Sequence, residues 1–490
     1  MTDDTADPTA TTARVDVLVV GAGPCGLALG IDLARRGVDA LVVEKADGLF
    51  PGSRGKGIQP RTMEVFDDLG VLAGIRAAGG PYPVSMIWRD GVRVGEHSMF
   101  DPAEPTEDAP YNEPWMVPQW RTQEVLHARL TELGGRVAFG REVIGLDQDD
   151  DATATGGGDG GGDGGRVTVR FASGGDVRAR HVVAADGGRS TVRRLLGIGM
   201  TGETVDPRPT LVADVRVTGL DRDNWHVFPP REGDDEGGFL ALCPLAGTED
   251  FQLAAQFPEH TPPEGVDLSL DGIRKLVAAR THLAPEDVTE VRWASDFRPR
   301  AALADRFRSG RVLLAGDAAH VHSPAGGQGL NTSVQDAYNL GWKLGAVLSG
   351  AADPALLDTY EAERLPNAAA MLGLSTSVHR GETRRGDATR QLNLAYPDSP
   401  LTEETRPDPG PVRAGDRAPD GTVDGVRLFD AFRGPHWTLL TVDPATPHPT
   451  YGAGVYLVRP DGYVGWAGAS EEGVRAYAER VGARDVRRVG

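Results

Sequence analysis

A hexapeptide near the N-terminus combines residue types that could hold a phosphate group. Gly21, Gly23 and Gly26 occur as Gly-x-Gly-x-x-Gly after a run rich in valine. The first glycine permits a tight turn, the second lets a pyrophosphate approach the backbone, and the third lets a helix pack against a strand. Glu44 follows at the distance where a carboxylate accepts hydrogen bonds from ribose hydroxyls and repels a 2′-phosphate. We therefore predict a dinucleotide site; the alternative is a glycine-rich turn followed by a surface glutamate.

A second group of small and polar residues lies near position 320. Asp317 follows an apolar run, and Gly326, Gly327 and Gly329 precede an amphipathic stretch. Glycines at these positions expose backbone N–H groups, and the N-terminus of a helix attracts negative charge. A ligand that spans both groups must be long, which suits a dinucleotide that carries an electron-accepting ring at its far end.

Apolar patterns predict the elements that would position both groups. A β-branched run at 15–20, helical spacing over 27–36 and an apolar run at 40–43 indicate a strand–helix–strand unit. Further helices are expected over 62–72, 124–133 and 330–348, and further strands over 137–146, 167–171, 181–185 and 311–315. Alternating apolar and polar residues between 211 and 291 predict an antiparallel sheet with one solvated face.

Composition excludes several classes of protein. The 490 residues allow roughly two to four domains, and 51 basic against 71 acidic residues give a net charge of −20. That charge disfavours binding to nucleic acid or to anionic membranes. Two cysteines exclude a disulfide scaffold, and His320 and His322 lack a nearby third ligand, so we expect no metal site. Because no signal-like start and no long apolar span occurs, we expect a cytoplasmic protein.

The two groups occur in the order of a known family. Together with Asp186-Gly187-Gly188-Arg189-Ser190 between them, they resemble the FAD-dependent aromatic hydroxylases, which are single-component flavin monooxygenases with the para-hydroxybenzoate hydroxylase fold. The resemblance covers about residues 14–375. The stretch 53–64 resembles the branch that hydroxylates polycyclic aromatic polyketides in antibiotic pathways, and 457–462 is similar to the thioredoxin-like tail of that branch.

The resemblance implies an α/β fold with three domains. These are a Rossmann-like FAD-binding domain of the glutathione-reductase type, an antiparallel-sheet substrate domain and a thioredoxin-like C-terminal domain. We expect a disordered tail over 1–13, the FAD-binding domain over 14–81, 117–199 and 296–380, the substrate domain over 82–116 and 200–295, a linker over 381–411 and the C-terminal domain over 412–490.

The same resemblance implies roles for individual residues. Gly21, Gly23 and Gly26 would enclose the FAD pyrophosphate, and Glu44 would bind the adenosine ribose. The other candidate cofactor residues are Lys45, Arg54 near the pyrophosphate, Gln119 at the ribityl chain, Val143 near the adenine, Asp186, Gly316, Asp317 at the ribityl or phosphate end, Pro324, and Gly329, Leu330 and Asn331 at the pyrimidine edge of the flavin. For Asp186, an Asp-Gly turn without a cofactor role is the alternative.

Four aromatic residues are candidate contacts for a substrate ring: Trp88, Trp115, Trp225 and Phe239. Plain core packing is the alternative for each of them. The implied chemistry needs no protein nucleophile, so we assign no catalytic side chain.

The implied function is hydroxylation of a polycyclic aromatic substrate with NAD(P)H and O2 through a flavin C4a-hydroperoxide. No second Gly-x-Gly-x-x-Gly occurs, which leaves NADPH and NADH both open. A Baeyer–Villiger monooxygenase and a non-catalytic FAD-binding protein remain alternatives. A flavin halogenase would need Trp-x-Trp-x-Ile-Pro, which Trp115 and Trp120 do not form. The expected partners are the small aromatic substrate and O2, and the protein is expected to be a monomer or homodimer.

Overall fold

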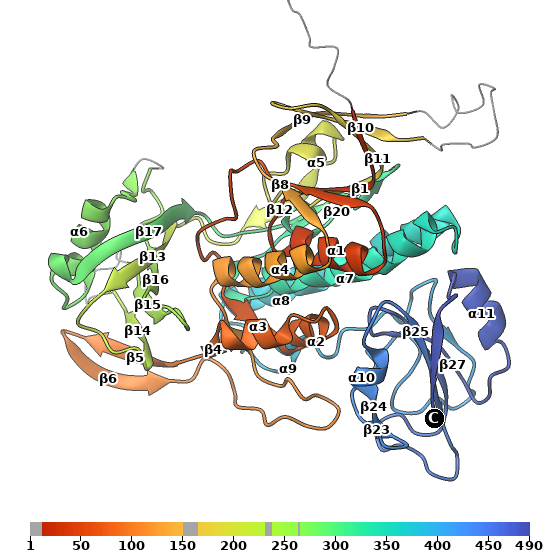
Figure 1. Cartoon of the computed structure of the whole chain (residues 1–490). Helices are drawn as coiled ribbons and strands as arrows, with labels where there is room; N and C mark the ends of the chain where they lie inside the picture. The colour runs from red at the N-terminus through yellow and green to blue at the C-terminus, as the bar shows by residue number, and fades with distance from the viewer. Residues whose placement is uncertain (1–11, 150–164, 231–237, 263–264) are drawn as a thin grey trace, which may run out of the picture.

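The computed structural model describes residues 12–149, 165–230, 238–262 and 265–490 (Figure 1). The expected N-terminal tail lies outside the described residues up to residue 11. The largest sheet contains the predicted strand–helix–strand unit and confirms an α/β architecture. Its parallel strands follow the order β20-β11-β1-β2-β8. Their bounds are β1 (Ala13–Val20), β2 (Ala40–Val43), β8 (Arg136–Ala138), β11 (Val177–Ala184) and β20 (Val312–Leu314).

Strand β1 lies at the centre of this sheet because its β-branched run is apolar on both faces. Val17, Leu18 and Val19 have no exposed surface. Helix α1 packs against α4 and α7, so the glycine turn between β1 and α1 lies next to both of these helices. The helices around this sheet are α1 (Pro24–Arg35), α4 (Gln119–Glu132), α7 (Gly329–Leu348) and α8 (Asp358–His379).

Two predicted elements differ from the structure. The helix expected over 62–72 is α2 (Pro60–Asp68), which ends before residue 72 because Gly70 adopts a left-handed φ of +74°, and α3 (Leu72–Ala77) follows it as a separate helix. The strand expected over 137–146 is also divided. Its first part is β8, which extends the parallel sheet, and its second part is β9 (Val143–Gln148), which pairs antiparallel with β10 (Val167–Phe171).

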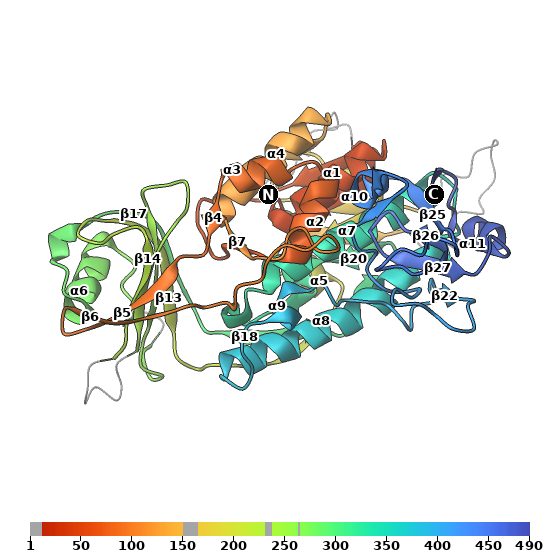
Figure 2. The same ribbon diagram turned by 90° about the horizontal axis from the view of Figure 1, so that it is seen from below.

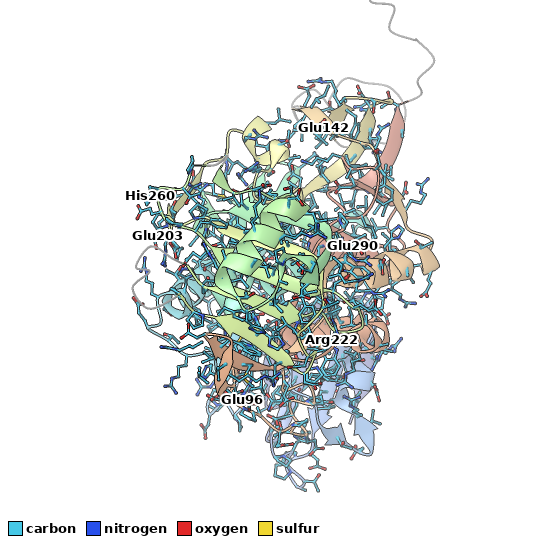
Figure 3. The ribbon with its side chains drawn as sticks, turned by 90° about the vertical axis from the view of Figure 1, so that its left-hand side faces the viewer. Glu96, Glu142, Glu203, Arg222, His260 and Glu290 are labelled. Carbon is cyan, nitrogen blue, oxygen red and sulfur yellow. The ribbon has the colours of Figure 1, made fainter. Side chains whose placement is uncertain are left out.

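The predicted antiparallel region forms a separate seven-stranded sheet in the order β17-β13-β16-β15-β14-β5-β6. Helix α6 (Leu270–Arg280) lies in front of it in Figure 3, and apolar side chains of the sheet pack beneath that helix. We call the opposite face the inner face. The strand bounds are β5 (Val84–Arg89), β6 (Val92–His97), β13 (Thr210–Val217), β14 (Asn224–Phe228), β15 (Leu240–Pro244), β16 (Phe251–Gln256) and β17 (Val288–Phe297).

A third sheet lies at the C-terminal end, beside α2 and α7 (Figure 2). Its strands follow the order β22-β27-β26-β25-β28. The first of them falls within the stretch expected as a linker. The bounds are β22 (Glu403–Glu404), β25 (Trp437–Val442), β26 (Gly454–Val458), β27 (Val464–Gly468) and β28 (Val486–Val489), with helices α10 (Leu428–Phe432) and α11 (Val474–Val481).

Short elements complete the described chain: β3 (Gly57–Ile58), β4 (Gly80–Pro81), β7 (Trp115–Met116), β12 (Met200–Thr204), β18 (Arg300–Ala304), β19 (Arg308–Ser309), β21 (His320–Val321), β23 (Thr422–Val423), β24 (Val426–Arg427), α5 (Thr191–Leu195) and α9 (Asp387–Arg390). Within the described ranges, no helix has both the length and the apolar character needed to span a membrane.

Candidate functional site

The glycine turn between β1 and α1 has the geometry that its spacing predicts. Gly21 has a φ of +110°, and a Cβ there would lie 2.3 Å from the carbonyl oxygen of Ala185. A Cβ on Gly26 would lie 1.9 Å from the carbonyl oxygen of Gly21. A Cβ on Gly23 would meet no atom of a described residue within 4 Å. Gly21 and Gly26 are therefore required by packing, whereas Gly23 borders open space where a ligand could approach.

Glu44 lies beside this turn, directly after β2. One carboxylate oxygen accepts the backbone N–H of Ala22 at 3.0 Å, and the other accepts that of Ala46 at 3.0 Å. Both oxygens keep further lone pairs that ligand hydroxyls could use. Lys45 beside it is exposed, and Val143 at the start of β9 is buried.

The loop before β3 and the start of α4 meet at the same site. The backbone N–H of Gly55 donates to Oε1 of Gln119 at 3.0 Å. A Cβ on Gly55 would lie 3.7 Å from Cδ1 of Leu330, so the start of α7 lies here too. Arg54 is exposed and close enough to Asp317 to favour its ionised form. The structure thus brings together segments that lie far apart in the chain.

Asp317 follows β20 in a turn that Gly316 begins with a left-handed φ of +62°. Its carboxyl group is accessible to solvent, yet the surrounding protein desolvates it enough to raise its pKa. An accessible oxygen acceptor in this setting can bind hydroxyl groups of a ligand.

Asp336 on α7 fixes the position of this turn, which the sequence did not predict. Its carboxylate accepts the backbone N–H of Gly316 at 2.9 Å and pairs with Nε2 of His320 at 2.6 Å. Arg364 on α8 donates to the other oxygen at 2.7 Å. His320 and Arg364 together hold the pKa of Asp336 at about 2, against the effect of burial. His320 in turn contacts His322 at 3.0 Å, and burial lowers the pKa of His322.

The start of α7 is positioned by a side chain of the same helix. Asn331 accepts the backbone N–H of Gln59 at 2.8 Å and donates to the carbonyl oxygens of Gly57 and Gly327 at 2.9 and 2.8 Å. The first N–H groups of α7, from Gly329 onward, have no acceptor within the helix and can bind a ligand. Pro324 lies exposed in the preceding loop.

Asp186 caps a short helix. One carboxylate oxygen accepts the backbone N–H groups of Thr191 and Val192 at 2.8 and 3.2 Å, at the start of α5. The other oxygen is buried and has no hydrogen-bond partner among the described residues. A structural role is therefore evident, and one acceptor is left over.

The four candidate aromatic residues occupy different surroundings. Trp88 lies on the α6 side of the seven-stranded sheet, where its Nε1 donates to His226 at 3.0 Å and its ring stacks on Phe228 at 6.0 Å between centroids. Trp225 lies on the inner face, under Lys56. Trp115 lies in β7 with a buried, unpaired Nε1, and Phe239 is 36% exposed. Trp225 thus contacts Lys56 and Trp115 pairs with Ile58, whereas Trp88 packs on the side of the sheet that α6 covers.

No group of three or more histidine, cysteine or acidic side chains in the described part of the chain could hold a metal ion. His320 and His322 are instead bonded to each other and, through His320, to Asp336.

Comparisons with known proteins point to one class of enzyme. Residues 14–375 match the family model described as an FAD binding domain. A flavin-dependent monooxygenase of Mycobacteroides abscessus is 45% identical over 494 residues, covering 95% of this chain and 99% of that protein. The 12-dehydrotetracycline 5-monooxygenase/anhydrotetracycline 6-monooxygenase of Streptomyces rimosus is 34% identical over 515 residues, covering 94% of this chain and 96% of that protein. The solved structure of aklavinone-11 hydroxylase with FAD and aklavinone matches with a TM-score of 0.81 and 29% identity, covering 97% of this chain and all of that chain.

Proposed function

The chain belongs to the FAD binding domain family and is a flavin-dependent monooxygenase, and from this premise we propose that it hydroxylates a polycyclic aromatic substrate of polyketide type with NAD(P)H and O2. The observation that carries the proposal is the meeting of three separate segments beside the substrate sheet. These are the turn at Gly21, the Gly55–Gln119 contact and the turn at Asp317 with the start of α7.

The residues present fit FAD along its length. Open space at Gly23 and the N-terminus of α1 suit the pyrophosphate, and Glu44 beside them suits the adenosine ribose. Asp317, Arg54 and Gln119 suit the ribityl chain and the phosphates. The proposed remainder of the FAD site is Gly21, Gly26, Lys45, Val143, Asp186, Gly316, Pro324, Gly329, Leu330 and Asn331.

FAD would supply the redox chemistry and the activation of O2, while the chain supplies placement and electrostatics. The free N–H groups at the start of α7 would stabilise negative charge on a ligand at that point. Asn331 holds those groups against the loop 57–59, so the helix end is fixed relative to the rest of the site.

We also propose that the three sheets correspond to an FAD-binding, a substrate-binding and a thioredoxin-like domain. The third sheet supports this, since four of its strands and α10 are arranged around one buried core. Both cysteines, Cys25 and Cys243, lie outside it, so residues 412–490 lack the thiol pair that disulfide exchange requires. We assign to this part a role in packing or in assembly of a homodimer.

The test of the function uses the purified yellow protein with NADPH or NADH and a panel of polycyclic phenols. We expect ligand-stimulated oxidation of the reduced nicotinamide and a product that gains one oxygen with its rings intact. A product with an oxygen inserted beside a ketone would identify a Baeyer–Villiger reaction instead. Absence of stimulation by any panel member, with FAD bound, would favour a non-catalytic FAD-binding protein.

The proposed cofactor contacts predict a loss of FAD affinity. Replacing Asp317 or Glu44 by alanine removes an acceptor for a hydroxyl group, and a hydrogen bond to a charged group contributes about 1.5–3 kcal/mol, or about 10- to 100-fold in affinity. FAD titration of the apoprotein measures the effect, with the exposed Glu382→Ala as the control. Unchanged affinity in both variants would show that these carboxylates do not contact FAD.

A further inference from the structure

Lys56 connects the flavin site to the substrate sheet. Its neighbours in the chain belong to the candidate site, since Gly55 donates to Gln119 and Gly57 accepts from Asn331. Its own carbonyl oxygen accepts the N–H of Val117 at 2.7 Å. The backbone of Lys56 is therefore held at the flavin site on both sides, while its side chain extends to the inner face of the substrate sheet.

The ammonium group of Lys56 is buried against an aromatic ring and an amide, and its charged neighbours are Asp214 and Arg385. Its Nζ lies 4.0 Å from the centre of the Trp225 ring and donates to Oε1 of Gln252 at 2.5 Å. The side chain is buried, and the loss of water lowers its pKa. Cys243 lies close by and is fully buried. One N–H of this cation thus donates to an amide and a second lies within bonding reach of the Cys243 sulfur, which leaves the third donor for a further acceptor.

Asp214 lies next to this cation on the same face of the sheet, in register with Gln252 on the neighbouring strand. It is 1% exposed, and neither carboxylate oxygen makes a hydrogen bond of acceptable geometry to a described residue, although Ser53 lies near enough to favour the ionised form. Burial raises its pKa to about 6, with Asp250 acting in the same direction and Lys56 against it. Buried polar atoms without partners are rare in native proteins and point to a ligand.

Two further buried atoms beside this pair, Oγ of Ser53 and Nε1 of Trp225, make no hydrogen bond of acceptable geometry to a described residue. Aromatic surface extends from Trp225 to Tyr82 at 6.4 Å and on to Phe100 at 5.0 Å between ring centres. Hydrogen-bond donors and acceptors thus lie at one end of this region, and a row of aromatic rings extends from them. It suits a flat aromatic ligand that carries a hydroxyl group, because a hydroxyl oxygen both accepts and donates, whereas a carboxylate would be repelled by Asp214.

Building on the proposed function, we propose that Lys56 and Asp214 bind a ring hydroxyl of the aromatic substrate. Lys56 donates a hydrogen bond to the hydroxyl oxygen, and the Asp214 carboxylate accepts a hydrogen bond from the hydroxyl O–H. The hydroxylated ring is thereby positioned relative to the flavin, because the backbone of Lys56 is part of the flavin site.

The experiment uses the FAD-loaded full chain and two probes, a dihydroxyanthraquinone and its dimethyl ether, whose affinities are measured by fluorescence titration. The wild type should bind the dihydroxy compound more tightly. Lys56→Met and Asp214→Asn should each weaken that binding about 10- to 100-fold and leave binding of the dimethyl ether nearly unchanged. The exposed substitutions Lys275→Met and Asp223→Asn serve as controls and should leave both affinities unchanged. FAD content and the unfolding temperature are recorded for every variant.

The outcomes separate this proposal from the proposed function. Equal affinity of the wild type for the two probes, or binding of neither, would overturn the assignment of Lys56 and Asp214, as would unchanged selectivity in both variants. Loss of FAD or of folding in both variants would show that the pair only joins the two parts of the protein, and would also overturn it. Selective binding without any ligand-stimulated NAD(P)H oxidation would contradict the proposed function alone.

Discussion

Replacing Glu363 by glutamine should lower the free energy of unfolding by about 3–5 kcal/mol, because it leaves buried cations without their partner. The Glu363 carboxylate is fully buried and accepts Nη1 and Nη2 of Arg459 at 2.7 and 2.9 Å, and Nζ of Lys343 at 2.7 Å. Asp461 pairs with the same arginine at 2.6 Å. The cluster thus holds two cations and two anions, and the substitution leaves one positive charge in excess.

Chemical denaturation followed by fluorescence measures the effect, with the exposed Glu472→Gln as a matched control. The dependence of the free energy of unfolding on pH provides a second measurement. The two cations hold the pKa of Glu363 well below its ordinary value of about 4.3, so its contribution is present above that pH and is lost as the pH falls below it. The Glu363→Gln protein has no such carboxylate, so its free energy of unfolding should fall less than that of the wild type as the pH is lowered. Equal stability of the two variants would show that the cluster contributes nothing net.

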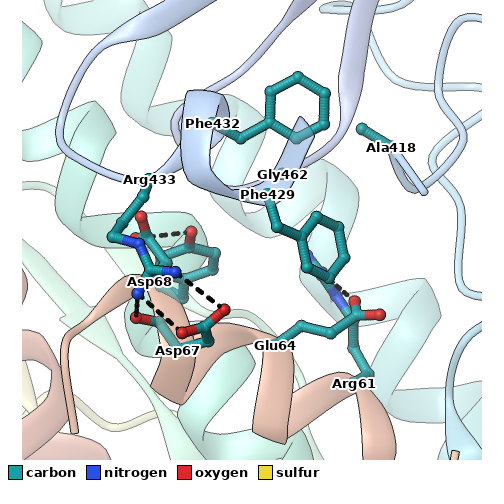
Figure 4. A pocket seen from close by; sticks show the side chains of 10 residues that line it. Arg61, Glu64, Asp67, Asp68, Ala418, Phe429, Phe432, Arg433 and Gly462 are labelled. Atoms are coloured by element: carbon teal, nitrogen blue, oxygen red, sulfur yellow. Dashed lines mark hydrogen bonds and ion pairs between the residues drawn. The ribbon is translucent and has the colours of Figure 1, made fainter. Parts of the chain in front are cut away.

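This cluster joins the C-terminal sheet to α7 and α8, beside the proposed flavin site. Arg61 on α2 donates to the carbonyl oxygen of Asp461 at 2.8 Å. Arg417 pairs with Glu64 at 2.8 Å, and Arg433 pairs with Asp67 at 2.7 Å. Figure 4 shows Arg433 facing Asp67, and Arg61 beside Glu64, in a small pocket between α2 and α10. The packing role proposed for the C-terminal part therefore extends to α7, which carries Lys343 near its end and the residues proposed for the flavin site at its start.

The sequence could predict the elements that have a local cause. A β-branched run, a glycine turn and a helical repeat define β1, α1 and β2 with little help from the rest of the chain, and the structure confirms them. The break between α2 and α3 depends on the conformation of Gly70 alone, which a helical pattern does not reveal. Strand β8 could not be separated from β9 by pattern, because its partner β2 lies far away in the sequence.

Side chains whose role depends on distant partners escaped prediction. Asp336 looks like one polar residue of an amphipathic helix, yet it joins Gly316, His320 and Arg364. Lys56 lies in the stretch 53–64 without a role that the resemblance assigns to it, Asp214 carries no motif, and only the meeting of a loop with a sheet makes them a pair. Trp88 and Trp225 are equivalent in sequence terms, and the register of β5 and β14 decides which face each occupies. These roles arise from tertiary packing, and the hydrophobic repeat along the chain does not indicate which distant residues come together.

Exchange of Gly23 for alanine should abolish tight FAD binding while leaving the fold intact, whereas Gly21→Ala should impair both. A Cβ on Gly23 meets no atom of a described residue within 4 Å, so the apoprotein should tolerate it. The same methyl group would occupy the space through which the pyrophosphate must approach the backbone, and we expect a loss of at least about 100-fold in affinity, or roughly 3 kcal/mol. On Gly21 the Cβ would stand 2.3 Å from the carbonyl oxygen of Ala185 at a φ of +110°. That strain should lower the stability of the apoprotein by about 1–3 kcal/mol.

The two variants form a matched pair, since they differ by one methyl group placed two residues apart in the same turn. Unfolding of the apoproteins and titration with FAD separate stability from affinity. The decisive result is a Gly23→Ala protein with the stability of the wild type and almost no bound flavin. The methyl group would then fit the folded protein and prevent FAD binding, which is expected only if FAD lies against this turn. If Gly23→Ala kept its FAD affinity, the pyrophosphate would have to lie elsewhere, and the roles proposed for Glu44 and the N-terminus of α1 would be wrong with it.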